Sequence, residues 1–103
     1  MDNDAVYVRV WEYEVPAEHV ESFLAAYAPE GPWARLFDEG DGFLGTDLFR
    51  EAGGGSRFLT VDRWADEESW SQFLDRFREA YEALDARLEG LAATERPLVE
   101  GNG

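Results

Sequence analysis

Alternation of side-chain character with a period of two residues is the feature that most constrains this 103-residue chain. It occurs in residues 5–15, 42–51 and 57–64, and such a period places successive side chains on opposite faces of a β-strand. A weaker segment, residues 92–100, contains Pro97, which confines a strand to a sheet edge or to a strand end. The sequence therefore predicts four strands.

Two stretches with helical periodicity lie between these strands. The first begins at Pro16, a favoured first helical residue, and ends near Pro29. The second follows Asp66, a good N-cap, and ends near Gly90. Each carries one apolar stripe: Val20, Phe23, Leu24 and Tyr27 in the first, and Trp70, Phe73, Leu74, Phe77, Tyr81, Leu84 and Leu88 in the second.

The order strand, helix, strand, strand, helix, strand predicts an α+β fold, the ferredoxin-like βαββαβ antiparallel sheet with both helices on one face. Residues 52–56, AGGGS, are expected at the tip of a hairpin, because they lack the Lys and Ser/Thr of a phosphate loop. Residues 33–42 are expected to form a short helical turn and a loop. The length predicts a single domain, residues 1–103, with an ordered core of about residues 5–100.

The composition excludes several classes of partner and chemistry. The net charge is −14, from 23 acidic and 9 basic residues, and every basic residue except His19 is an arginine. Such a field repels nucleic acid and anionic membranes. The absence of lysine fits either a salt-rich cytoplasm or a GC-rich genome, and the absence of cysteine excludes disulfides, thiol catalysis and Cys-ligated zinc. With no signal peptide and no membrane-spanning run, a cytoplasmic protein is expected.

The predicted strands separate into an aliphatic and an aromatic face. The aliphatic face holds Val6, Val8, Val10, Leu44, Thr46, Leu48, Leu59 and Val61, and we expect it to pack on the helices. The aromatic face holds Tyr7, Arg9, Trp11, Tyr13, Phe43, Gly45, Asp47, Phe49, Phe58, Thr60, Asp62 and Trp64. Water is a poor partner for that many aromatic rings. We therefore expect a homodimer joined through the aromatic face, which gives a dimeric α+β barrel.

The strand order, with the segments "DGFLGTDLFRE" and "FLTVDRWADEESWSQF", resembles the antibiotic-biosynthesis monooxygenase-like proteins, a family with the dimeric α+β barrel fold. The resemblance covers about residues 5–100, and "GPWARLF", "GTDL", "TVDRW" and "YEALDAR" are similar to a branch of small proteins in this family. It implies either oxygenation of aromatic polyketides without metal or flavin, or haem degradation. The haem-degrading members have an Asn in the first strand and a Trp and a His in the last helix. In this sequence the first strand has no Asn, the last helix has no His, and Phe73 stands where the Trp would be. Haem degradation is therefore disfavoured, and no cofactor or metal is expected.

Arg9, Asp47 and Asp62 are the charged residues of the aromatic face. If the hairpin is symmetric about its glycines, Asp62 lies opposite Gly45 and has space beside it. Partial desolvation would then raise its pKa, as a general base requires. The alternatives are an ion pair between Arg9 and Asp62, or an Asp62 side chain that caps backbone groups.

Trp11, Trp33 and Trp64 are candidates for the walls of a flat substrate pocket, with Asp47 as a further substrate-binding candidate. Interface packing would require the same tryptophans. Trp70 is expected in the core, and His19 on a solvated helix face, because residues 18, 19 and 21 do not converge as metal ligands.

Two functions are consistent with these residues. The first is a monooxygenase-like enzyme acting on a small planar phenolic or quinol-type metabolite, with Arg9 orienting an anionic oxygen and Asp62 accepting a proton. The second is a non-catalytic dimeric binding or accessory domain, and an isomerase or cyclase on the same scaffold is a further alternative.

Overall fold

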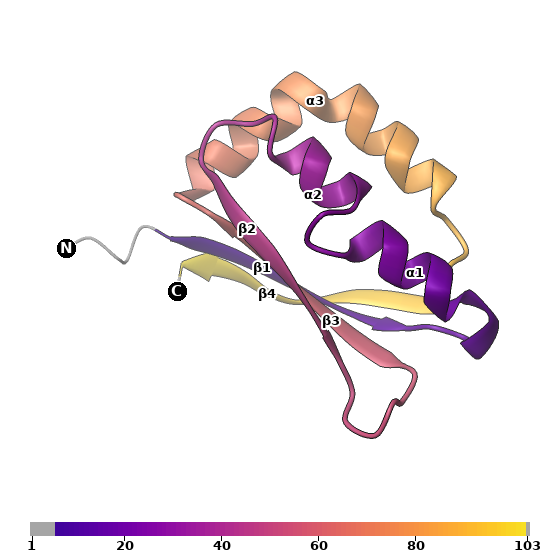
Figure 1. Cartoon of the computed structure of the whole chain (residues 1–103). Coiled ribbons are helices and arrows are strands. Elements are labelled where there is room, and N and C mark those ends of the chain that lie inside the picture. Colours follow the sequence, from indigo (N-terminus) through magenta and orange to yellow (C-terminus); the bar gives the residue numbers. More distant parts are fainter. Residues whose placement is uncertain (1–5, 103) are drawn as a thin grey trace.

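The computed structural model describes residues 6–102. Its strands are β1 (Tyr7–Glu14), β2 (Phe43–Arg50), β3 (Arg57–Trp64) and β4 (Thr94–Asn102), and its helices are η2 (Ala17–His19), α1 (Val20–Tyr27), α2 (Pro32–Phe37) and α3 (Glu67–Arg87). The strands form one antiparallel sheet in the order β2-β3-β1-β4. All helices cover one face of this sheet, and the other face is open (Figure 1). The predicted ferredoxin-like fold is confirmed.

Local sequence signals explain where the elements begin and end. Asp66 accepts a hydrogen bond from the backbone N–H of Ser69 at 2.8 Å, which caps the N-terminus of α3. At the hairpin tip Gly53 and Gly54 have φ angles of 82° and 75°, a region that favours glycine. The Arg50 guanidinium closes the tip by donating to the carbonyl oxygens of Gly54 and Gly55 at 3.0 and 2.9 Å.

The register of the β2–β3 hairpin differs from the expected one by one residue. Asp62 pairs with Thr46, and Asp47 pairs with Val61, because the register shifts between Phe43 and Gly45. A slip of one residue moves a side chain to the opposite face of the sheet. The prediction that Asp47 shares a face with Asp62 is therefore wrong.

The orientation of the sheet was also predicted wrongly. Tyr7, Arg9, Tyr13, Phe58, Thr60 and Trp64 are buried beneath the helices, whereas Leu44, Phe49, Leu98 and Val99 are exposed. The aromatic residues of β1 and β3 thus pack on the helices, which themselves contribute large rings from Trp33, Phe37, Trp70 and Phe73 to the core. Aromatic side chains bury more surface per residue than aliphatic ones, and they fill the wide space between a sheet and a helical layer. The prediction of a dimer joined through the aromatic face is overturned by this packing.

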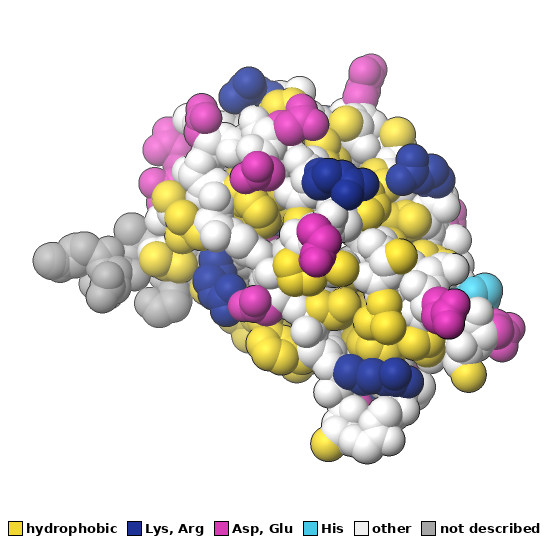
Figure 2. Space-filling model, viewed as in Figure 1, with side chains coloured by type: hydrophobic (Ala, Val, Ile, Leu, Met, Phe, Trp, Pro, Cys, Tyr) yellow, Lys and Arg dark blue, Asp and Glu magenta, His cyan; other side chains and the backbone are white. Residues whose placement is uncertain are grey.

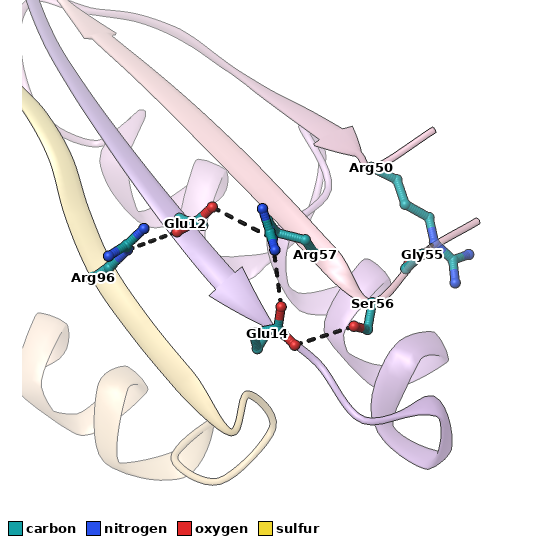
Figure 3. Close-up of polar contacts among 7 residues, drawn as sticks. All are labelled: Glu12, Glu14, Arg50, Gly55, Ser56, Arg57 and Arg96. Carbon is teal, nitrogen blue, oxygen red and sulfur yellow. Dashed lines mark hydrogen bonds and ion pairs between the residues drawn. The ribbon is translucent and has the colours of Figure 1, made fainter. Parts of the chain in front are cut away.

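The open face of the sheet combines aliphatic side chains with ion pairs. We define it by the residues that point away from the helices in the paired strands: Val8, Val10, Glu12, Glu14, Asp47, Phe49, Arg57, Leu59, Val61, Arg63, Arg96 and Val99. Figure 3 shows Glu12 between Arg96 of β4 and Arg57 of β3, at 2.7 and 3.7 Å, with Arg57 also reaching Glu14. A further pair joins Arg63 to Asp47 at 2.6 Å.

The charges on this face differ from those on the rest of the molecule. Three arginines face three carboxylates there, so the open face is neutral in a chain with a net charge of −14. The excess of carboxylates lies elsewhere, and Figure 2 shows acidic side chains scattered over the helical layer. Within residues 6–102, no helix combines the length and the apolar character needed to cross a bilayer.

Trp64 provides a test of the core. Its side chain is fully buried, and its Nε1–H donates to no acceptor among residues 6–102. Trp64→Phe removes apolar contact but also removes an unsatisfied N–H, which by itself costs about 1–3 kcal/mol. We expect a loss of no more than about 2 kcal/mol in the free energy of unfolding by urea titration, against less than about 0.5 kcal/mol for the exposed control Leu44→Ala. A loss above about 4 kcal/mol would contradict the missing hydrogen bond.

Candidate functional site

A cavity of about 170 Å³ lies between the buried face of the sheet and helices α2 and α3. Six of its lining residues are aromatic: Trp11, Tyr13, Trp33, Phe37, Trp70 and Tyr81. The other four are charged: Arg9, Asp62, Asp85 and Glu95. Strands β1, β3 and β4 supply one side of this cavity and the two helices supply the other.

Asp62 is the most perturbed acid of the cavity. Its Oδ1 accepts a hydrogen bond from the Thr46 hydroxyl at 2.5 Å, across the β2–β3 pair. Burial raises the pKa of Asp62 to about 6 from its ordinary 3.8, although the Thr46 hydrogen bond and the charges of Arg9 and Arg63 oppose the rise. A carboxyl group with a pKa near 6 exchanges protons readily near neutral pH, which is what a general base requires.

Arg9 lies directly opposite Asp62 in the β1–β3 pair but forms its ion pair elsewhere. Its guanidinium contacts the Glu100 carboxylate of β4 at 3.1 Å, and its Cζ lies 4.1 Å from the centre of the Trp70 ring. Within residues 6–102 Arg9 makes no ion pair with Asp62, and the one hydrogen bond of the Asp62 carboxylate is to Thr46. Neither alternative for Asp62, the Arg9 pair or a backbone cap, is therefore found.

Trp33 and Trp70 belong to one aromatic wall of the cavity, because each packs against both Phe37 and Tyr81. Trp33 packs against Phe37 and Tyr81, with ring centres 5.7 and 5.1 Å apart. Trp33 is 8% exposed, and its ring also packs against Tyr27, with ring centres 6.2 Å apart. Burial raises the pKa of the Tyr27 hydroxyl, and the indole N–H of Trp33 beside it opposes the rise.

Acidic side chains stand at the mouth of the cavity. Asp85 of α3 and Glu95 of β4 are exposed, in contrast to the buried Arg9 and Trp33. Partial burial raises the pKa of Glu95, and the negative charges of Asp85 and Glu89 add to the rise. The mouth is therefore a region where like charges lie close together.

The structure brings four of the six predicted site residues together and separates two. Arg9, Trp11, Trp33 and Asp62 line the cavity. Asp47 lies on the open face and pairs with Arg63, for the register reason given above. Trp64 belongs to the core beside Phe37, Phe43 and Trp70, because it stands at the end of β3 where the helices cover it completely.

Several cavity residues were not predicted as parts of the site. Trp70 was expected only in the core, and it both packs there and lines the cavity. Tyr81 and Asp85 are four residues apart on α3, a spacing that places both on one side of a helix. That spacing was available as a signal, whereas the pairing of Thr46 with Asp62 depends on the register shift in β2.

The structure is therefore a ferredoxin-like sheet with an aromatic cavity between the sheet and its helices. The sequence profile of the antibiotic biosynthesis monooxygenase family matches residues 6–87. The chain belongs to this family. Among the curated proteins, no sequence matches this chain.

Solved structures share the fold at low sequence identity. SnoaB from Streptomyces nogalater, described as a cofactor-independent oxygenase, is 17% identical with a TM-score of 0.66, over 92% of each chain. MupZ from Pseudomonas fluorescens is 17% identical with a TM-score of 0.67, over 90% of this chain and 70% of that one. A putative antibiotic biosynthesis monooxygenase from Nitrosomonas europaea is 14% identical with a TM-score of 0.71, over 100% and 94%.

Proposed function

We propose that this protein is a cofactor-independent monooxygenase that oxidises a small phenol or quinol-type metabolite in the cavity under the helices. The observation that carries the proposal is Asp62, a carboxyl group with a pKa of about 6 among aromatic rings. Family membership supports the reaction class, and SnoaB is a cofactor-independent oxygenase of the same fold.

The reaction needs no reductant besides the substrate. Asp62 accepts the phenol proton, and the resulting phenolate donates electrons from its ring to O₂. A C–O bond forms at the ring carbon para to the hydroxyl, which gives a hydroperoxide. This carbon then loses its hydrogen as the O–O bond breaks, so that one phenol and one O₂ give one quinone and one water.

The other cavity residues serve binding and orientation in this proposal. Trp11, Trp33 and Trp70 hold the ring between flat surfaces, and Arg9 gives a positive field that favours the phenolate over the phenol. Because Glu100 already pairs with Arg9, the guanidinium acts at longer range than a direct ion pair with the substrate would.

The proposal is tested by oxygen consumption with 3-ethylphenol, whose position para to the hydroxyl is free. Incubation under ¹⁸O₂ should place one labelled oxygen in the quinone product and one in water. Binding of the phenol with no oxygen consumption above a protein-free control would contradict the enzyme and support the alternative, a binding domain.

The pH dependence of turnover follows from the pKa of Asp62. Only the ionised carboxylate accepts a proton, and its pKa is about 6. We expect kcat/KM to rise about tenfold per pH unit below that value and to become constant above pH 7. A profile that is flat between pH 5 and 8 would eliminate Asp62 as the base.

We further infer that two copies of the chain pack through the open face. Phe49 and Val99 of the open face are 52% and 51% exposed, and Leu98, which is 45% exposed, lines a hollow with Phe49 and Leu59. Exposed apolar side chains gathered on one neutral face are typical of an interface. A second copy of the chain would cover these side chains on the open face, which gives a homodimer.

A further inference from the structure

The charges that line the cavity are unequal. Its one basic side chain, Arg9, pairs with Glu100 at 3.1 Å and lies over the ring of Trp70. Its three carboxylates, Asp62, Asp85 and Glu95, make no ion pair with any residue in 6–102. The lining therefore holds three carboxylates against one guanidinium.

A second hollow of about 290 Å³ adjoins the mouth and extends this negative region. It shares Asp85 and Glu95 with the cavity and adds Glu82 and Glu89. Four carboxylates thus line this hollow beside the mouth of the cavity, in a protein whose net charge is −14. Such a field raises the local concentration of cations and repels anions.

The walls of the cavity are suited to an organic cation rather than to a metal ion. Within residues 6–102, no three His, Cys, Asp or Glu side chains converge as a metal site would require. The faces of tryptophan and tyrosine rings attract ammonium groups, and the wall contains both.

The size of the cavity limits the ring system. An engineered cavity of about 150 Å³ takes one benzene ring, and this cavity measures about 170 Å³. One aromatic ring therefore fills it, and a short substituent reaches the mouth.

From these observations we propose that the cavity binds a single-ring hydroxyaryl amine, with its ring between the tryptophans and its protonated amine at the carboxylates of Asp85 and Glu95. This inference rests on the proposed function for the site and narrows the substrate class to cations. The amine keeps its proton at neutral pH, so its charge opposes that of the acidic mouth.

Three ligands with one ring and different charges test the proposal: 3-hydroxyphenethylamine (cationic), 3-ethylphenol (neutral) and 3-hydroxyphenylacetate (anionic). Calorimetric titration without oxygen isolates binding from turnover. We expect the amine to bind about tenfold more tightly than 3-ethylphenol, and the acid to bind about tenfold more weakly. Equal or tighter binding of the acid, or no binding of any of the three, would overturn the proposal.

A double variant of the mouth locates the effect. Asp85→Asn with Glu95→Gln should reduce the preference for the amine to less than about twofold and leave the affinity for 3-ethylphenol unchanged. Asp75→Asn with Glu79→Gln removes the same charge from exposed positions of α3 that do not line the cavity, and it should keep the preference. Equal loss in both variants would mean that net charge, rather than the mouth, selects the ligand, which contradicts the proposal.

The same ligands separate this inference from the proposed reaction, because all three have a free position para to the hydroxyl. Tight binding of the amine with no oxygen consumption would support the ligand class and contradict the oxygenase. Turnover of 3-ethylphenol with no preference for the amine would support the oxygenase and overturn the ligand class.

Discussion

Asp62→Asn is expected to lower kcat for phenol oxidation by about 10²–10⁴-fold, the usual contribution of a general base. Asparagine keeps the size of the side chain, and its Oδ1 can still accept the hydrogen bond that Thr46 donates. Binding of the substrate should therefore change little while proton transfer is lost. Oxygen consumption measured with saturating 3-ethylphenol gives the loss directly, and unchanged turnover would show that Asp62 is not the base.

The same variant should be more stable than the parent at neutral pH. The folded-state pKa of Asp62 is about 6, above the ordinary 3.8, so the folded protein binds a proton more tightly than the unfolded chain does. Stability from this group is fully present below pH 4 and is lost as the pH rises to 6. Above pH 6 the buried charge costs up to about 3 kcal/mol, and asparagine removes that cost. Urea titrations at pH 7.5 and pH 4 should show the gain only at the higher pH.

Asp47→Asn is the matched control for both effects. It makes the same chemical change in the same hairpin, but Asp47 lies on the open face, paired with Arg63 at 2.6 Å. We expect unchanged kcat and no gain in stability at pH 7.5, because Asp47 is paired with Arg63 and its ionisation carries no burial cost of the kind that Asp62 has. Stabilisation of both variants to the same extent would mean that lower net charge, rather than burial of Asp62, explains the gain.

The elements of the fold were predictable from local patterns, because periodicity, caps and glycines act within a few residues. The direction in which the sheet faces was not, because both faces carry enough apolar surface to pack on helices. The aromatic residues of β1 and β3 are the ones that pack on the helices. Trp64, for example, contacts the rings of Phe37 and Trp70, and Phe37 in turn contacts Trp33. A pattern of period two assigns residues to two faces but does not say which face the helices cover.

The site was predictable where it depends on the β1–β3 pair and not where it depends on β2 or β4. Arg9 and Asp62 face one another in a regular register. The register shifts beside Phe43 in β2, and Thr46 rather than Asp47 reaches Asp62. It also shifts beside Trp11 in the β1–β4 pair, and Glu100 of β4 reaches Arg9. Shifts of this kind arise from pairing between distant segments, so single-sequence periodicity misses them.

The charge distribution is a separate argument that the open face is an interface. Self-repulsion opposes the association of two copies of a chain with 23 acidic and 9 basic residues. On the open face this repulsion is removed locally, because each carboxylate there has an arginine partner in the same sheet. Figure 3 shows the partners of Glu12 and Glu14. The ion pairs satisfy the charges before association, so that burying the face leaves none of them without a partner.

Introducing one unpaired carboxylate on this face should therefore separate the dimer. Val99→Glu and Phe49→Glu place it on β4 and on β2, at side chains that are 51% and 52% exposed in the single chain. The fold of each subunit should be retained, while charge repulsion and desolvation weaken association by about 100-fold or more. Light scattering at micromolar concentration and moderate salt should give a dimer for the parent and a monomer for either variant. Ser71→Glu adds the same charge to an exposed position of α3 and should remain dimeric; a monomeric parent, or a dimer that survives both open-face variants, would contradict this interface.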